Sequence, residues 1–240
     1  MLRRKRNKAM ISQRLDVSGI PAILWGAPSD KAFIYVHGKL SRKEYAAGFA
    51  DIAEANGWQT LSFDLPGHGE RIGGPDKCNV WNGVRDLDTI ADYAFGNRER
   101  VSLFACSLGA YFALNAYPER KLEKALFQSP IVDMKWLVEH MMLWAGVTPG
   151  QLEREKRIYT PIDTLDWEYY RYILSHPADD WPFPTRILYA GKDDLQPEAS
   201  VRDFARKHSA VLTVAPESRH PFMEPGDKTI VEEWIKSSFE

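Results

Sequence analysis

Short apolar runs alternate along the chain with segments in which apolar residues recur at helical spacing. Residues 32–36 (Ala-Phe-Ile-Tyr-Val) and 101–105 (Val-Ser-Leu-Phe-Ala) are nearly continuous apolar runs, which are typical of strands buried on both faces. Between them, the apolar residues from 84 to 94 follow the period of a helix. This alternation predicts a mainly parallel sheet covered by helices.

Further apolar runs complete an expected eight-stranded sheet, at residues 11–17, 21–25, 60–65, 125–128, 186–190 and 210–214. No helical segment separates the first two runs, so we expect them to pair as an antiparallel edge. Helices are expected over residues 41–56, over 108–117 and around 230–235. The expected fold class is therefore α/β, with a mainly parallel eight-stranded sheet flanked by helices.

The alternation fails between Pro130 and Pro182. The residues between them have the pattern of two or three helices rich in Met and Trp, so we interpret residues 131–181 as a small helical cap or lid insert. Residues 10–130 and 182–240 then form one main domain, which agrees with the single large domain expected of 240 residues.

The overall composition excludes several classes of protein. Hydrophobic residues make up 44% of the chain and charged residues 27%, so neither disorder nor a membrane-embedded chain is indicated. The formal net charge of -2 gives no general attraction to nucleic acid or to an anionic membrane. No apolar run reaches the ~18 residues of a membrane span. We expect neither nucleic acid nor a membrane span, and the sequence does not indicate an oligomeric state.

The basic residues between positions 3 and 8 are not followed by an apolar stretch, so no secretory signal is complete. Residues 1–9 are expected to form a poorly ordered basic tail. The cysteines, Cys78 and Cys106, match neither a disulfide framework nor a zinc site. This usage favours a reduced, cytoplasmic protein.

The central chemical signal is Ala105-Cys106-Ser107-Leu108-Gly109, which lies between an expected strand and an expected helix. Small residues two positions before and after a serine let the chain turn sharply, so that the hydroxyl projects above the sheet. Taken alone the motif is weak, because a serine at an ordinary strand-to-helix turn can simply cap the helix. A serine hydroxyl is also a poor nucleophile unless a base activates it and a third group orients that base.

Candidates for both partners follow later strands. Asp193 and Asp194 lie in the turn after the strand at 186–190, and His220 lies in the loop after the strand at 210–214. The carboxyl ends of parallel strands share one edge of the sheet, where ligands of open α/β sheets gather. The alternative is a solvated turn carboxylate and a surface loop histidine.

These features, taken together and in this order, resemble the α/β-hydrolase superfamily, in particular its small esterases and its monoglyceride-lipase-like and acyl-aminopeptidase-like hydrolases. The resemblance covers nearly the whole chain and rests on His37-Gly38, Asp64 with Pro66-Gly67-His68-Gly69, the serine turn, the turn at 191–197 and His220. It implies that Ser107 is the nucleophile and His220 the base. The acid of the family usually stands three residues after the glycine, which favours Asp194 over Asp193.

The same resemblance places the backbone N–H groups of Lys39 and Leu108 in an oxyanion hole. The Lys39 side chain is expected to be solvated, with a contact to an anionic substrate group as the alternative. Most apolar residues of the insert are expected to bury against the main domain. The remainder would roof an acyl pocket, and the expected pocket residues are His37, Gly38, Trp136, Met141 and Trp144.

The function implied is hydrolysis of a small-molecule carboxylic ester, with a small or medium acyl chain, through an acyl-enzyme intermediate. This chemistry requires no cofactor, and no histidine has a partner at a spacing typical of metal ligands, so no metal is expected. Because the catalytic groups do not distinguish the leaving group, a thioesterase or a serine peptidase is an alternative. A non-hydrolytic lyase or a binding protein of the same fold is a further alternative.

Overall fold

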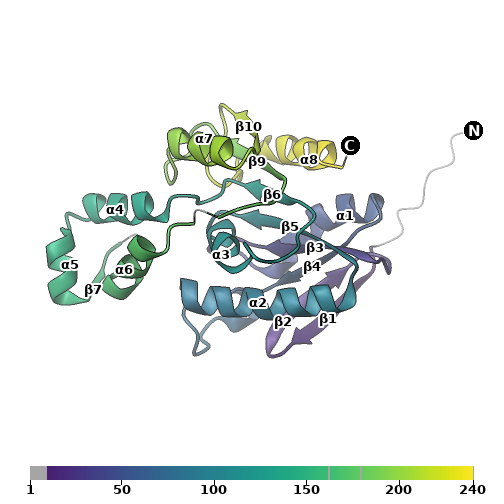
Figure 1. Ribbon diagram of the computed structural model, residues 1–240, viewed down its shortest axis with the longest axis horizontal. Helices are drawn as coiled ribbons and strands as arrows, with labels where there is room; N and C mark the ends of the chain where they lie inside the picture. The colour runs from purple at the N-terminus through teal and green to yellow at the C-terminus, as the bar shows by residue number, and fades with distance from the viewer. Residues whose placement is uncertain (1–9, 162, 179, 240) are drawn as a thin grey trace, which may run out of the picture.

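An eight-stranded sheet forms the centre of the protein (Figure 1). The structure is a computed structural model that describes residues 10–161, 163–178 and 180–239, so the predicted basic tail at 1–9 lies outside the described residues. The strands of this sheet are β1 (Ser12–Val17), β2 (Ile20–Trp25), β3 (Lys31–Val36), β4 (Gln59–Phe63), β5 (Arg100–Cys106), β6 (Ala125–Gln128), β9 (Thr185–Ala190) and β10 (Val211–Ala215).

The strand order across the sheet is β1-β2-β4-β3-β5-β6-β9-β10. From β4 to β10 in this order, neighbouring strands run parallel. At the other edge, β2 pairs antiparallel with both β1 and β4. The predicted mainly parallel sheet with an antiparallel edge is therefore confirmed.

Helices cover both faces of the sheet. They are α1 (Ala47–Ala55), α2 (Val80–Asn97), α3 (Leu108–Ala116), α4 (Met134–Trp144), α5 (Pro149–Glu155), α6 (Trp167–Ser175), α7 (Glu198–Lys207) and α8 (Asp227–Ser237), with 3-10 turns η1 (Lys43–Ala46) and η2 (Gly69–Arg71). The helix expected over 41–56 thus begins as the 3-10 turn η1 and becomes α-helical only in α1. Within the described ranges, none of these helices is both long and apolar enough to cross a membrane.

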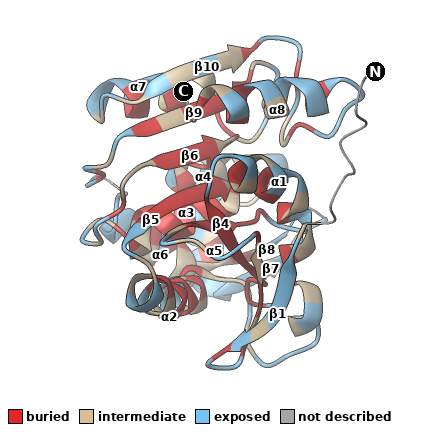
Figure 2. Ribbon diagram, turned by 90° about the vertical axis from the view of Figure 1, so that its right-hand side faces the viewer, coloured by how far each residue is buried: buried red, intermediate tan, exposed pale blue. Residues whose placement is uncertain are grey.

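Alternate residues of β3 show how the two faces are built, because successive side chains of a strand point to opposite faces. Phe33 and Tyr35 enter the core beneath α1 and α8. Ile34 and Val36 enter the larger core beneath α2, α3 and α7. All but the first residue of β3 are buried, and Figure 2 shows the same for the central strands, whereas β1 is largely exposed.

The segment between β6 and β9 contains α4, α5 and α6 together with a small antiparallel hairpin, β7 (Arg157–Tyr159) and β8 (Thr164–Asp166). The sequence pattern predicted the helices but not the hairpin. Val138, Leu152 and Ile173 from this segment are buried in the same core as α2 and α3. The segment is therefore packed on the main domain, and in Figure 1 it extends from one end of the sheet.

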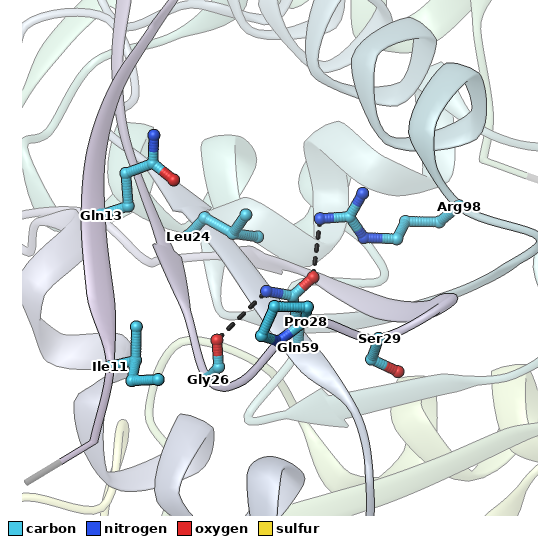
Figure 3. A pocket seen from close by; sticks show the side chains of 8 residues that line it. All are labelled: Ile11, Gln13, Leu24, Gly26, Pro28, Ser29, Gln59 and Arg98. Carbon is cyan, nitrogen blue, oxygen red and sulfur yellow. Dashed lines mark hydrogen bonds between the residues drawn. The ribbon is translucent and has the colours of Figure 1, made fainter.

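A hollow of about 230 Å³ lies at the edge of the sheet where β4 and β5 begin (Figure 3). Two of the polar side chains that line it are already hydrogen-bonded: Arg98 Nη2 donates to Gln59 Oε1 at 2.6 Å, and Gln59 Nε2 donates to the Gly26 carbonyl at 3.1 Å. The opposite edge, where the parallel strands end, carries the residues that the sequence analysis singled out.

Candidate active site

Ser107 occupies a strained turn between β5 and α3. Its backbone has φ 52° and ψ -121°, a left-handed φ that a residue with a side chain rarely adopts. The small neighbours make the turn possible, since a Cβ at Gly109 would lie 2.5 Å from the His37 carbonyl oxygen. The loop after β3 also passes close, because a Cβ at Gly38 would lie 3.1 Å from the Cβ of Ser107.

Ser107, His220 and Asp193 form a continuous series of hydrogen bonds. Ser107 Oγ lies 2.8 Å from His220 Nε2, and His220 Nδ1 lies 2.8 Å from Asp193 Oδ2. The carboxylate needs a donor, so Nδ1 carries the ring proton and Nε2 is free to accept the hydroxyl proton. The Asp193 and His220 side chains are 0% and 7% exposed, which shields the series from bulk water.

The structure places Asp193, and not the expected Asp194, against His220 Nδ1. Asp194 is exposed at the surface of the turn. Asp193 Oδ1 accepts the backbone N–H groups of Leu195 at 2.8 Å and Gln196 at 3.1 Å, which turns the other carboxylate oxygen toward His220. An aspartate whose side chain accepts the N–H groups two and three residues onward forms an Asx-turn. This local turn favours Asp193 over Asp194 as the carboxylate that faces His220.

Gln128 ties the histidine loop to the serine turn. Its backbone carbonyl accepts the N–H of Ser107 at 3.1 Å, and its side-chain Nε2 donates to the Pro221 carbonyl at 2.9 Å. The sequence analysis did not identify this residue. One glutamine at the end of β6 therefore contacts both the residue at the turn and the residue after His220.

Cys106, which precedes Ser107, is held in its protonated form. Burial, together with the nearby charge of Asp193, raises the pKa of the Cys106 thiol to about 12. The reactive form of cysteine is the thiolate, so this thiol stays protonated and inert at neutral pH.

The loop after β3 is held by a buried ion cluster. Lys43 is 1% exposed, and its Nζ donates to Asp64 at 2.5 Å and to Glu70 at 2.7 Å. Burial alone would lower the pKa of Lys43, but the hydrogen bonds that its ammonium donates to Asp64 and Glu70 outweigh burial and raise the pKa. His68 adds a further anchor, because its Nε2 accepts the N–H of Leu40 at 3.0 Å. These bonds fix the backbone that follows Lys39.

His37 is a structural residue of this loop. It is 1% exposed, its Nε2 accepts the N–H of Leu65 at 3.0 Å, and its Nδ1 contacts the Gly38 carbonyl at 2.7 Å. This pairing requires the neutral ring, with the proton on Nδ1. Burial lowers the pKa of His37 to about 4.

We expect this histidine to make the protein less stable in mild acid. As the pH falls from about 6.5 to about 4, the unfolded chain takes up a proton at His37 and the folded chain does not, so the free energy of unfolding decreases. At about 1.4 kcal/mol per pKa unit, the loss approaches ~3 kcal/mol. Urea unfolding of the wild type and of His37→Gln across this range measures it. The variant should lose less stability than the wild type, and equal losses would contradict the assignment.

Two sets of contacts join the segment between β6 and β9 to the loop after β3 and to α2. Lys39 Nζ forms an ion pair with Asp163, in the turn between β7 and β8. The ring of Trp81, in the first turn of α2, contacts Tyr169 and Tyr172 of α6, with centroids 6.0 and 5.6 Å apart. The Lys39 side chain, expected to be solvated, is thus partly exposed and paired.

The remaining expected pocket residues lie on different faces of α4. Met141 packs against the main core. Trp136 stacks on His140 at a centroid distance of 3.9 Å, and Trp144 meets the same histidine edge-on at 5.1 Å. Trp144 is 46% exposed. The two tryptophans therefore line one face of their own helix, and their contacts give no support to a place in the acyl pocket.

The model of the alpha/beta hydrolase family matches residues 33–232 of the sequence, which includes Ser107, Asp193 and His220. The chain belongs to the alpha/beta hydrolase family. No curated protein matches its sequence.

Solved structures share the fold of this alpha/beta hydrolase. Est1E from Butyrivibrio proteoclasticus, with ferulic acid bound, is 17% identical, with a TM-score of 0.76 over 94% of this chain and 97% of that one. Mouse alpha/beta hydrolase domain-containing protein 10 is 16% identical, with a TM-score of 0.74 over 95% and 98%. A monoacylglycerol lipase of Paleococcus ferrophilus is 18% identical, with a TM-score of 0.64 over 91% and 98%. At these identities, the likeness establishes the fold.

Proposed function

We propose that this alpha/beta hydrolase cleaves carboxylic esters of small or medium acyl chain through an acyl-enzyme intermediate. The observation that carries the proposal is the pair of 2.8 Å hydrogen bonds that join Ser107 to His220 and His220 to Asp193. In this role Ser107 attacks the ester carbonyl while His220 takes its proton. Asp193 holds the imidazole in the required tautomer and stabilises the imidazolium that forms.

The tetrahedral intermediate requires N–H donors for its oxyanion. We assign them to the backbone of Leu108 and Lys39. Leu108 is the first residue of α3, and the first N–H groups of a helix have no partner within the helix. Lys39 follows Gly38, which lies against the Cβ of Ser107. The ion cluster at Lys43 and the His68 contact to Leu40 support a rigid loop at this position.

The segment between β6 and β9 is proposed to cover the approach to Ser107. The ion pair of Asp163 with Lys39 and the contacts of Trp81 with α6 support this place for it. A cover that excludes water protects an acyl-enzyme from premature side reactions and governs substrate entry.

The ester class is supported by the fold likeness to an esterase with bound ferulic acid and to a monoacylglycerol lipase. A fluorophosphonate probe and a series of p-nitrophenyl esters, from acetate to palmitate, test the proposal. We expect one covalent adduct, on Ser107, and the highest rates with short or medium chains. Absence of an adduct in active protein would exclude Ser107 as the nucleophile, and faster cleavage of a matched thioester or anilide would reassign the substrate class.

A further inference from the structure

Gln196 has a buried side chain whose amide oxygen and nitrogen are both fully hydrogen-bonded. The residue is 0% exposed and lies between β9 and α7. Its Oε1 accepts the N–H groups of Val132 at 2.9 Å and Asp133 at 2.7 Å. Its Nε2 donates to the carbonyls of Asp133 at 3.0 Å and Leu195 at 2.9 Å. Since an amide side chain accepts two such bonds and donates two, its capacity is fully used.

The backbone of the same residue holds the acid. The N–H of Gln196, with that of Leu195, donates to Asp193 Oδ1. The carbonyl of Gln196 accepts the Tyr189 hydroxyl at 2.8 Å, which anchors the turn to β9. The side chain and the backbone of Gln196 therefore connect residues 132–133 to the carboxylate that contacts His220.

Residues 131–133 also reach the serine. The N–H of Ile131 donates to the carbonyl of Ser107 at 3.2 Å. A closed ring of contacts then runs from Ser107 through residues 131–133 to Gln196 and Asp193, and returns through His220 to the Ser107 hydroxyl. A displacement at any point of such a ring is transmitted to its neighbours, because each buried bond that breaks leaves a polar group unpaired.

Helix α4 begins at this ring. Asp133, whose backbone N–H and carbonyl both bond to Gln196, is the N-cap of α4, and its side chain accepts the N–H of Trp136 at 2.9 Å. The next residue, Met134, is 5% exposed and packs in the main core. The start of α4 therefore cannot shift without moving the group to which Gln196 is bonded.

We infer that Gln196 is a positioning residue that couples the start of α4 to the catalytic acid. It sets Asp193, and through it His220, relative to Ser107. This role rests on the proposed function of Ser107, His220 and Asp193. The hydrogen bonds described for Gln196 go to neither the Ser107 nor the His220 side chain.

The test uses Gln196→Leu, which keeps the approximate size, removes the four side-chain hydrogen bonds and leaves the backbone bonds of residue 196 in place. We expect kcat on a p-nitrophenyl ester to fall about 10²-fold in the leucine variant, as for other misplacements near 1 Å. KM should stay within about threefold, because the residue does not touch the substrate.

Each rate is divided by the concentration of sites titrated to completion with the fluorophosphonate, so that unfolded protein does not count as slow enzyme. Gln151→Leu is the matched control, since among the described residues the Gln151 side chain in α5 bonds to Glu155 alone, and its kcat should equal that of the wild type. If the leucine variant does not fold, Tyr189→Phe removes the hydroxyl that anchors the Gln196 carbonyl, and it should lower kcat several-fold at constant KM.

An unchanged kcat per titrated site in Gln196→Leu or Tyr189→Phe would overturn the positioning role. So would a loss that appears only in KM. These outcomes are distinct from failure of the proposed function, which would appear in the wild type as an active protein without an adduct on Ser107.

Discussion

Ser107→Ala is expected to lower the turnover of ester substrates by about 10⁶-fold, the order of loss found when the nucleophile of a serine hydrolase is removed. The reason is geometric as well as chemical. The Ser107 hydroxyl is the group that lies 2.8 Å from His220 Nε2, so its loss leaves the base with no nucleophile to activate. The initial rate of p-nitrophenyl ester hydrolysis, measured on folded variant and wild type, gives the ratio.

Ser102→Ala is the matched control for this measurement. Ser102 lies in the same strand β5, is 0% exposed, and its hydroxyl has no hydrogen-bond partner among the described residues. Removing that hydroxyl should leave turnover unchanged. A Ser107→Ala protein that retained more than a small fraction of wild-type activity would remove Ser107 from the mechanism.

Asp193→Asn is expected to lower turnover by about 10⁴-fold, because it imposes the wrong histidine tautomer. The backbone N–H groups of Leu195 and Gln196 both point at the Oδ1 position, so the amide oxygen of the asparagine stays there. Its NH₂ group then faces His220 Nδ1, which must become the acceptor. The ring proton moves to Nε2, where it can no longer accept the proton of Ser107.

Asp194→Asn is the control that separates the tautomer effect of Asp193→Asn from the loss of one negative charge in the turn. Asp194 is exposed, and the variant should keep turnover within about twofold of wild type, as surface substitutions away from a site usually do. Paired kcat and KM measurements on the two asparagine variants decide the assignment. A large loss in Asp194→Asn with a small one in Asp193→Asn would restore the aspartate that the family spacing favoured.

The choice between these two aspartates shows where sequence reasoning stops. Both follow a buried strand and both are acidic, so periodicity and composition treat them alike. The family spacing from Gly191 favoured Asp194, but the N–H groups of Leu195 and Gln196 select Asp193. That selection depends on where Gln196 lies, and its side chain is bonded to a segment more than 60 residues earlier.

The hairpin β7–β8 and the aromatic residues of α4 also show features that the sequence pattern does not predict. Three-residue strands are too short for a period-two pattern to be recognised in sequence. Trp136 and Trp144 have the flat apolar side chains expected in an acyl pocket. In the structure, however, both rings contact His140 of their own helix. Apolar character predicts that a side chain will be covered but not which surface will cover it.

By itself the sequence determined the alternation of strands and helices, the parallel sheet, and the strand ends that carry Ser107 and His220. These follow from local periodicity and from small residues at a sharp turn, which are properties of neighbouring positions. Only the tertiary structure decided which carboxylate lies against the histidine and that Gln196 bonds both to residues 132–133 and to Asp193. Those outcomes depend on hydrogen bonds between segments far apart along the chain, where the direction of each backbone N–H is set by the folded turn.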